Sequence, residues 1–311
     1  MNESGRAEES EETIVSFVVE QSRKRLDKVV RDRVPTLSRS QSQRLIESGE
    51  VTVDGKPRKP AYRVEPGESI SVVMPAPDEE GPPLAQAIPL DIIYEDSYLL
   101  AVNKPAGMVV HPAPGHSEGT LVNALLAHDR RIVDVGPSER AGIVHRLDRE
   151  TSGVIVAAKK AQVLNVLQEQ FRNRQVEKVY LALVHGRVQP PEGIIEVPIG
   201  RDPRDRQKMA PVAGGKYART RYRASEYLNR YTLIEAHPYT GRTHQIRVHL
   251  SWLGHPVVGD RMYGRGRHQL LEDRHFLHAW TLRCAHPVSG EDLWLEAPLP
   301  QELTDLLERL R

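Results

Sequence analysis

The chain has 311 residues, of which 39% are hydrophobic and 27% are charged, and its formal net charge is +1, as in an ordinary globular protein. A single cysteine, Cys284, excludes an intrachain disulfide framework, and the acidic N-terminal segment lacks the apolar stretch of a secretion signal. No apolar run approaches the roughly 20 residues that cross a bilayer, so we expect a cytoplasmic protein without a membrane segment.

The near-zero net charge conceals an uneven distribution. Residues 1–13 carry five Glu and one Arg, whereas residues 14–74 carry twelve Lys or Arg and eight acids. Residues 75–100 carry six acids and no Lys or Arg, and residues 201–223 carry eight Lys or Arg and two Asp. Local basic surfaces of this kind attract phosphate groups, although each run alone is also typical of a solvated face.

The N-terminal part predicts a disordered acidic tail over residues 1–13, followed by a small α/β domain over residues 14–76. The pattern within that domain is a strand, a helix from Leu26, a second helix capped by Ser38 and a hairpin turn at Asp54-Gly55. This arrangement resembles the αL RNA-binding module, a small fold shared with a small-subunit ribosomal protein. The basic residues expected to contact RNA are Arg25, Arg39, Arg44 and Lys56. A generic small domain with solvated cations is the alternative.

A Pro-rich linker is expected over residues 77–90, and one large domain over residues 91–311. Strands are expected at residues 92–94, 98–103, 154–158, 176–184, 217–226, 231–237, 277–284 and 293–297. Helices are expected at residues 120–128, around Leu164, Leu167 and Phe171, at residues 243–253, and from Glu302 onward. Runs of strands with a few helices favour an α+β fold with a mixed, largely antiparallel sheet.

The most informative segment is residues 143–153, IVHRLDRETSG, which places Asp148 between Arg146 and Arg149. Apolar runs at residues 141–144 and 154–158 are expected to hold this loop as two β-like segments. Because cations lie close to it, Asp148 should stay ionised, which suits a nucleophile better than a proton donor. The alternative is a turn residue that binds its own backbone.

The string HRLDxxTSG at residues 145–153 resembles the signature loop of the RluA/RluD family of RNA pseudouridine synthases. Three further segments fit in the right order, so the resemblance covers about residues 90 to 290. It implies a pseudouridine synthase fold in which Asp148 is the catalytic nucleophile. It also implies that Tyr180 packs on the uracil base and that Arg247 pairs with the catalytic Asp.

The same resemblance implies further contacts with the substrate. The residues expected to bind it are Arg146, His145, Arg242, His244 and Leu277. We expect neither a metal nor another cofactor, because His244 and His249 are five residues apart and do not share a helix face. The basic segment 201–223 is expected to be a mobile loop that closes on RNA.

The expected activity is therefore conversion of specific uridines to pseudouridine in RNA, by a monomer that acts on a flipped-out nucleotide. The N-terminal module together with this catalytic domain looks like the branch of the family that acts on 23S ribosomal RNA, and tRNA is the alternative substrate. A non-catalytic RNA-binding factor is a second alternative. A glycoside hydrolase is a third, but it needs a second carboxylate in the cleft, for which Glu150 is the nearest candidate.

Overall fold

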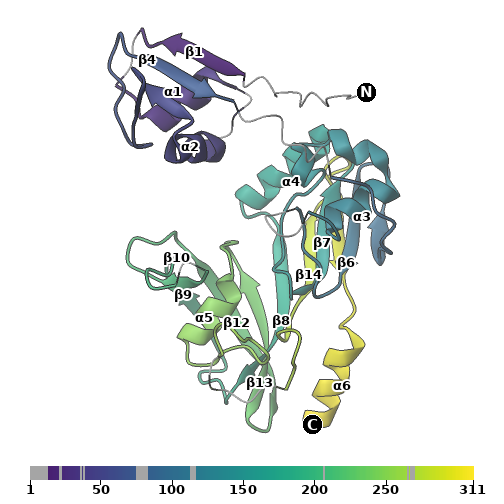
Figure 1. The fold of residues 1–311 in the computed structure, drawn as a ribbon. Coiled ribbons are helices and arrows are strands. Elements are labelled where there is room, and N and C mark those ends of the chain that lie inside the picture. The colour runs from purple at the N-terminus through teal and green to yellow at the C-terminus, as the bar shows by residue number, and fades with distance from the viewer. Residues whose placement is uncertain are drawn as a thin grey trace, which may run out of the picture. The chain divides into compact units, whose positions relative to one another are not determined.

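The computed structural model describes residues 13–20, 23–35, 37, 39–74, 83–112, 117–205, 207–264, 266 and 270–311 (Figure 1). The chain divides into two compact units, Met1–Gly81 and Pro82–Arg311. Within the described residues, no helix has the length and apolarity that crossing a membrane requires.

The described residues of the N-terminal unit form a four-stranded antiparallel sheet, in the order β1-β4-β2-β3, and two helices. Its elements are β1 (Ile14–Val18), α1 (Leu26–Arg33), α2 (Arg39–Ser48), β2 (Val51–Val53), β3 (Lys56–Pro57) and β4 (Ser69–Val73). The predicted strand, helices and hairpin are all present, whereas the predicted cap Ser38 lies outside the described residues. Asp54 and Gly55 both have positive φ, 49° and 72°, as a two-residue hairpin turn requires.

The apolar face of α1 explains the core of this unit. Leu26 and Val30 are fully buried and pack with Val51, Ile70 and Val72 of the sheet. The core is small but continuous, so this unit has a hydrophobic interior of its own.

The C-terminal unit is built on a sheet of nine strands among the described residues, in the order β5-β6-β7-β14-β8-β13-β12-β9, with β15 paired to β14. These strands are β5 (Ile92–Glu95), β6 (Leu99–Lys104), β7 (Ser152–Ala158), β8 (Glu177–His185), β9 (Glu192–Glu196), β12 (Arg219–Leu228), β13 (Tyr231–Pro238), β14 (Leu277–Ala285) and β15 (Asp292–Glu296). The pairing of β14 with β7 is parallel and the other pairings are antiparallel. The sheet is therefore mixed and largely antiparallel, and the predicted α+β class is confirmed.

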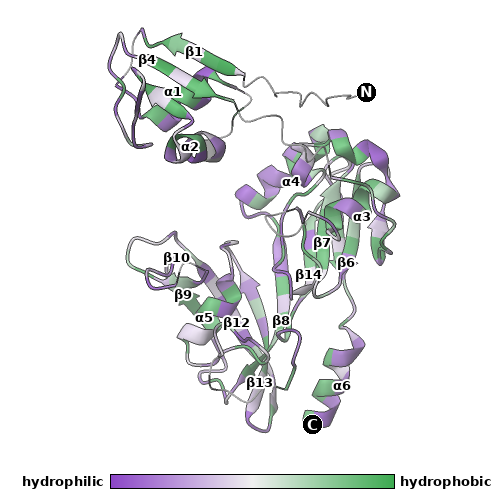
Figure 2. Ribbon diagram, viewed as in Figure 1, coloured by the Kyte–Doolittle hydropathy of each residue, from purple (hydrophilic) through white to green (hydrophobic). Residues whose placement is uncertain are grey.

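Helices cover both faces of the β6–β7 half of this sheet. They are α3 (Leu121–His128) and α4 (Ala161–Arg172). Alternate residues of β7 divide between the faces: Val154 and Val156 pack with residues of α4, while Ile155 packs with residues of α3. Burial on both faces explains why residues 154–158 of β7 are apolar without alternation. In Figure 2, α4 carries both hydrophobic and hydrophilic residues, as an amphipathic helix does.

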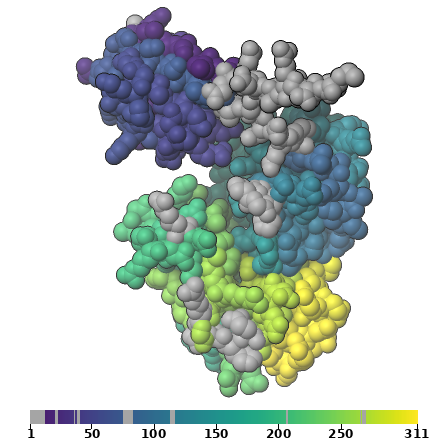
Figure 3. All heavy atoms as spheres, in the orientation of Figure 1, coloured from purple at the N-terminus to yellow at the C-terminus, as the bar shows by residue number. Residues whose placement is uncertain are grey.

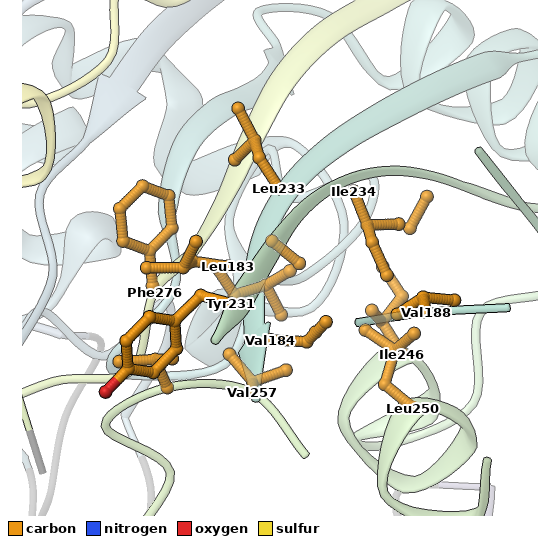
Figure 4. Close-up of a cluster of buried hydrophobic side chains, with 14 of the residues drawn as sticks. Leu183, Val184, Val188, Tyr231, Leu233, Ile234, Ile246, Leu250, Val257 and Phe276 are labelled. Carbon is orange, nitrogen blue, oxygen red and sulfur yellow. The ribbon is translucent and has the colours of Figure 1, made fainter. Parts of the chain in front are cut away.

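A second core lies between β8 and β13 and the helices α5 (Gln245–Trp252) and α6 (Gln301–Leu310). Leu183, Val184 and Ile234 are fully buried there, and Ile246 of α5 packs with them (Figure 4). This packing fixes the start of α5 against the end of β13, which is where the site described below is built.

Three segments differ from the sequence prediction. Residues 141–144 do not form a strand: Ile143 makes one isolated bridge to Ala157, Ala141 and Ile143 belong to the α3 core, and Val144 packs against the α4 core. The segment 201–223 is not one long loop: it contains the end of the hairpin β10 (Ile199–Arg201) and β11 (Met209–Pro211), and then β12. The end of the expected linker is attached to α3, since the Gln86 N–H donates to the Asn123 carbonyl oxygen over 3.0 Å.

Candidate active site

A cavity of about 540 Å³ brings the motif loop, α4, β8 and the β13–α5 junction together in the C-terminal unit. Figure 3 shows one face of this unit. Residues from its first half (blue to teal) lie on one side of that face, and residues 190–250 (green) lie on the other. The cavity is lined by six cationic side chains: Arg146, Arg172, Arg174, Lys178, Arg242 and Arg247. Among the described residues that line it, Asp148 is the only carboxylate. The site therefore has a strong excess of positive charge around one acid.

Asp148 is held by a chain of ion pairs. Arg247 Nη1 donates to Asp148 Oδ2 over 3.1 Å, and its Nε and Nη2 donate to the two carboxylate oxygens of Asp260 over 2.7 and 3.0 Å. The Asp148 side chain is 20% exposed, whereas those of Arg247 and Asp260 are 8% and 0% exposed. The buried pair fixes the guanidinium, and the guanidinium fixes the carboxylate that faces the cavity. The predicted pairing of Arg247 with Asp148 is present.

The pKa values of the buried pair follow from opposed effects. Burial lowers the pKa of Arg247, but the hydrogen bonds and negative charges of Asp260 and Asp148 outweigh it and raise the pKa above its ordinary value. Burial raises the pKa of Asp260, but the hydrogen bonds from Arg247 and the Tyr263 N–H and the positive charges nearby together outweigh it and lower the pKa. Both groups are therefore ionised at neutral pH.

The local sequence explains the position of Arg247. His244, at φ 55°, precedes α5, so Arg247 lies in the first turn of that helix with its side chain directed inward. Gln245 Oε1 accepts hydrogen bonds from the Thr240 hydroxyl over 2.7 Å and from the Arg242 N–H over 3.0 Å. Asp260 accepts the N–H groups of the two residues Met262 and Tyr263, each over 3.0 Å. The turn around Asp260 therefore supplies the anchor of Arg247.

A buried lysine supports the loop from the opposite side. Lys104 is fully buried, and its ammonium donates to the carbonyl oxygens of Pro105, Met108 and Arg149 over 2.6, 2.9 and 3.1 Å. Burial lowers the pKa of Lys104 to about 7. Because Arg149 follows Asp148 directly, these bonds fix the backbone beside the carboxylate.

Buried polar contacts connect the end of the same loop to β14 and to the residues that directly precede β14. The Thr151 hydroxyl lies 2.8 Å from His275 Nε2, and the Ser152 hydroxyl lies 2.8 Å from His278 Nδ1. Arg274 Nη2 donates to the Ser152 hydroxyl over 2.7 Å. Burial lowers the pKa of His275 to about 3 and that of His278 to about 4, so both imidazoles are neutral at pH 7.

Tyr180 and Lys178 share one face of β8 and both line the cavity, as the period of two predicted. Burial, reinforced by the charge of Asp148, raises the pKa of Tyr180, so its hydroxyl keeps its proton. Burial lowers the pKa of Lys178 to about 8. Leu277, 4% exposed, lines the same cavity and supplies an apolar wall.

The side chain of His145 stabilises the motif loop through a ring contact and a hydrogen bond. Its ring stacks on Phe171 with 4.6 Å between centroids, and its Nε2 accepts the Val156 N–H over 3.1 Å. Burial lowers the pKa of His145 to about 3, consistent with a neutral acceptor nitrogen. Its ring therefore braces the motif loop while it lines the cavity.

The two arginines that flank Asp148 in sequence do not hold its carboxylate. Arg149 pairs with Glu150 over 2.7 Å, and Arg146 is exposed and lines the cavity. The expectation that neighbouring cations fix Asp148 is corrected, since the guanidinium that donates to its carboxylate over 3.1 Å is that of Arg247, 99 residues along the chain.

Arg242 and His244 also border Asp148. His244 Nε2 lies 4.0 Å from Asp148 Oδ2, and its Nδ1 lies 2.8 Å from the Tyr263 hydroxyl. Burial is the largest cause of a lowered His244 pKa. Arg242 lines the cavity, and its Nε donates to the Tyr217 carbonyl oxygen over 2.9 Å. His249 lies elsewhere, bonded to Thr220 and to a backbone carbonyl.

Neither a metal centre nor a carboxylate pair is found in the described parts of the chain that form this site. The described residues contain no group of three or more His, Cys, Asp or Glu that could hold a metal ion. Glu150 lines a different cavity, of about 1010 Å³, to which Asp148 does not contribute. The two-carboxylate arrangement of a glycoside hydrolase is therefore not formed by Asp148 and Glu150.

The residues expected to contact RNA in the N-terminal unit behave differently from one another. Arg44 and Lys56 are exposed. Arg25 donates from Nε and Nη2 to the buried carboxylate of Asp27 over 3.0 and 3.2 Å, which holds its guanidinium at the surface. Arg39 begins α2, but its side chain lies outside the described residues.

Comparison with known proteins matches two family models. The model described as RNA pseudouridylate synthase matches residues 98–252, and the S4 domain model matches residues 24–70. The S4 match falls within the unit expected to be an RNA-binding module.

Curated relatives match over nearly the whole chain. An uncharacterized RNA pseudouridine synthase of Chloroflexus aurantiacus is 48% identical, over 97% of this chain and 95% of that protein. The ribosomal large subunit pseudouridine synthase D of Nitrosomonas europaea is 43% identical, over 92% of this chain and 84% of that protein.

A solved structure agrees in fold. The human RNA pseudouridylate synthase domain containing 4 is 30% identical with a TM-score of 0.55, over 70% of this chain and 92% of that chain.

Proposed function

The chain belongs to the RNA pseudouridine synthase family, and from this premise we propose that Asp148 acts on a uridine of large-subunit ribosomal RNA. Members of this family are isomerases: they convert uridine in RNA to pseudouridine. The single observation that carries the assignment of Asp148 is its position as the one carboxylate, among described residues, in a cavity lined by six cations.

The reaction sets the demands on the site. The N1–C1′ bond of uridine breaks, the freed base turns, and C5 bonds to C1′ while the C5 proton is lost and N1 gains a proton. No group is transferred from outside and no redox change occurs. Attack on the nucleoside and removal of a ribose proton are the two ways to begin, and both need an ionised carboxylate in a fixed position. Arg247 supplies that fixed position through its 3.1 Å contact with Asp148.

We assign Tyr180 to the base rather than to the sugar. Its raised pKa disfavours a phenolate base, so its role is to stack on uracil and to hydrogen-bond through a protonated hydroxyl. The detached base then stays beside the ribose while it turns, because Tyr180 and the apolar Leu277 line the same cavity.

The cationic lining suits the phosphates of an extruded nucleotide. A base inside a stack is out of reach of the carboxylate, so the target must be flipped out before reaction. Arg146 is exposed on the motif loop and lines the cavity, and a planar guanidinium can both stack and hydrogen-bond. We assign it to the space that the flipped nucleotide vacates.

Ribosomal RNA is the substrate that the relatives favour. Proteins named ribosomal large subunit pseudouridine synthase D are 42 to 44% identical over more than nine-tenths of this chain. The S4 unit, with exposed Arg44 and Lys56, would dock structured RNA through phosphate contacts.

Purified protein incubated with 23S rRNA or with tRNA transcripts tests this function. Wild type should form pseudouridine in 23S rRNA, and Asp148→Asn should lower the single-turnover rate at least about a thousandfold while RNA affinity changes little. Glu150→Gln is the matched control, an acid two residues away that lines the other cavity, and should retain activity. Modification of tRNA alone would contradict the substrate, and full activity of Asp148→Asn would contradict the role of the carboxylate.

A further inference from the structure

Two exposed tyrosines border the catalytic cavity and have no part in the chemistry assigned above. Tyr217 and Tyr239 are each 42% exposed. Tyr239 lines the cavity, and the carbonyl oxygen of Tyr217 accepts a hydrogen bond from Arg242, which also lines it. Large aromatic side chains left exposed at a concave, charged site are candidates for ligand contact.

The fold places both tyrosines at one end of a strand pair. Tyr217 stands two residues before β12, and Tyr239 directly follows β13. These strands are antiparallel with Thr220 opposite Pro238, and the Tyr239 N–H donates to the Arg219 carbonyl oxygen over 3.0 Å. The rings are therefore attached to a rigid sheet edge beside the cavity.

An arginine guanidinium lies close to each of the two tyrosine rings. The Cζ atom of Arg219 lies 4.7 Å from the centre of the Tyr239 ring, and that of Arg174 lies 5.7 Å from the centre of the Tyr217 ring. Arg174 follows α4 and lines the cavity from the opposite side. A flat ring beside a guanidinium offers both a stacking surface and a positive charge, the combination by which proteins hold unpaired nucleotides.

We propose that Tyr239 and Tyr217 form a stacking site for the unpaired RNA bases next to the target uridine, and that this site selects which uridine is modified. The inference rests on the proposed function. When the target nucleotide leaves its stack, its neighbours lose a stacking partner, and the rim tyrosines replace it. Phosphates of the same nucleotides meet Arg174 and Arg242, which fixes the strand direction relative to Asp148.

The test uses the full-length protein and hairpin RNAs that carry one uridine mapped as a target in 23S rRNA. One hairpin keeps the natural neighbours of that uridine, and the other has an abasic nucleotide on each side. Tyr239→Ala should lower kcat/KM about tenfold on the natural hairpin and by less than about twofold on the abasic one, since only the former has a base to stack. Tyr217→Ala should show the same dependence on the neighbours.

Two variants separate stacking from other causes. Tyr239→Phe keeps the ring and should retain wild-type kcat/KM on both hairpins. Trp294→Ala removes another exposed aromatic side chain, on β15 and outside the cavity lining, and should change neither value. A 2-aminopurine placed beside the target uridine should be quenched on binding to wild type and less so on binding to Tyr239→Ala, whether or not turnover follows.

Equal losses on both hairpins, or no loss on either with an active wild type, would overturn the stacking site and leave the proposed function intact. A wild type that modifies no uridine in 23S rRNA would instead overturn the proposed function, and the stacking site with it.

Discussion

The cavity around Asp148 and the surface of the S4 unit both carry cations to which we assign RNA contacts, but the two regions hold these cations in opposite ways. In the cavity, Arg247 is 8% exposed and is fixed by Asp260, which is fully buried. On the S4 unit, Arg44 and Lys56 are exposed. In the cavity, a buried ion pair fixes the position of one side chain. On the S4 unit, the positive charges are spread over an exposed surface.

The difference follows from what each region must do. An ion pair out of water is costly unless every charge is matched, so it is useful only where one atom must be fixed within a fraction of an ångström. Binding a phosphate backbone is the sum of many weak contacts and needs no single fixed atom. Changes in the cavity should therefore cause large losses, and changes on the S4 surface should cause small, additive ones.

The largest effect that separates the regions is expected at the buried anchor. Asp260→Ala removes the two hydrogen bonds that fix the Arg247 guanidinium and leaves it paired with Asp148 alone, so Asp148 loses its fixed position and the single-turnover rate should fall about a hundredfold. Unfolding should also become easier by about 3 to 5 kcal/mol, because a buried charge loses its fully buried partner. Rapid-quench kinetics and thermal unfolding measure the two effects.

An exposed ion pair provides the control. Asp292 pairs with Arg283 over 2.9 Å, with both side chains about half exposed, and Asp292→Ala should leave both the stability and the rate nearly unchanged, because solvent screens the pair. Similar losses for Asp260→Ala and Asp292→Ala would remove the distinction between the two kinds of charge.

Removal of the whole S4 unit should have the next largest effect. A protein that lacks residues 1–81 keeps every residue of the cavity lining, so the rate at saturating RNA should be preserved. Affinity for structured 23S rRNA should fall roughly thirtyfold, and its dependence on salt should become shallower, because phosphate contacts are lost. Filter binding across salt concentrations checks this, and equal affinity would show that the unit does not dock RNA.

The lowered pKa of Lys178 predicts that RNA binding by the cavity weakens as pH rises. Burial lowers its pKa to about 8, so it is charged at neutral pH and loses that charge as pH rises through this value. RNA affinity should fall about tenfold between roughly pH 7 and pH 9. Lys178→Arg stays charged throughout and should lack this fall. Lys104, with a pKa of about 7, is present in both proteins, so their difference isolates Lys178.

The smallest effects are expected for single cations of the S4 surface. Arg44→Ala and Lys56→Ala should each weaken binding by roughly two- to fivefold and reduce the slope of affinity against salt by about one, with no change in the rate at saturation. A hundredfold loss of RNA affinity from either change would equal the effect expected at the buried Asp260 and would contradict the comparison.

Local pattern was sufficient where neighbours in sequence determine the structure. The Asp54-Gly55 turn, the shared face of Lys178 and Tyr180, and the helix that carries Arg247 were all predicted. The match of the motif loop to a family placed Asp148 and Arg247 together.

Long-range contacts were beyond the pattern. The residues around Asp148 suggested Arg146 and Arg149 as its cations, and only the family resemblance indicated Arg247, which lies 99 residues away in sequence. The buried residues Asp260, which anchors Arg247, and Lys104, which holds the loop backbone, were not among the residues predicted for the site. Apolar residues 141–144 resembled a strand because a buried loop and a buried strand have the same composition.

The most direct measurement is a map of pseudouridines in rRNA and tRNA from cells that lack this protein, compared with cells that express wild type or Asp148→Asn in its place. The account predicts that specific uridines of 23S rRNA stay unmodified without the protein, regain pseudouridine with wild type, and remain uridine with the Asn variant. An unchanged map in the absence of the protein, or restoration by Asp148→Asn, would contradict it.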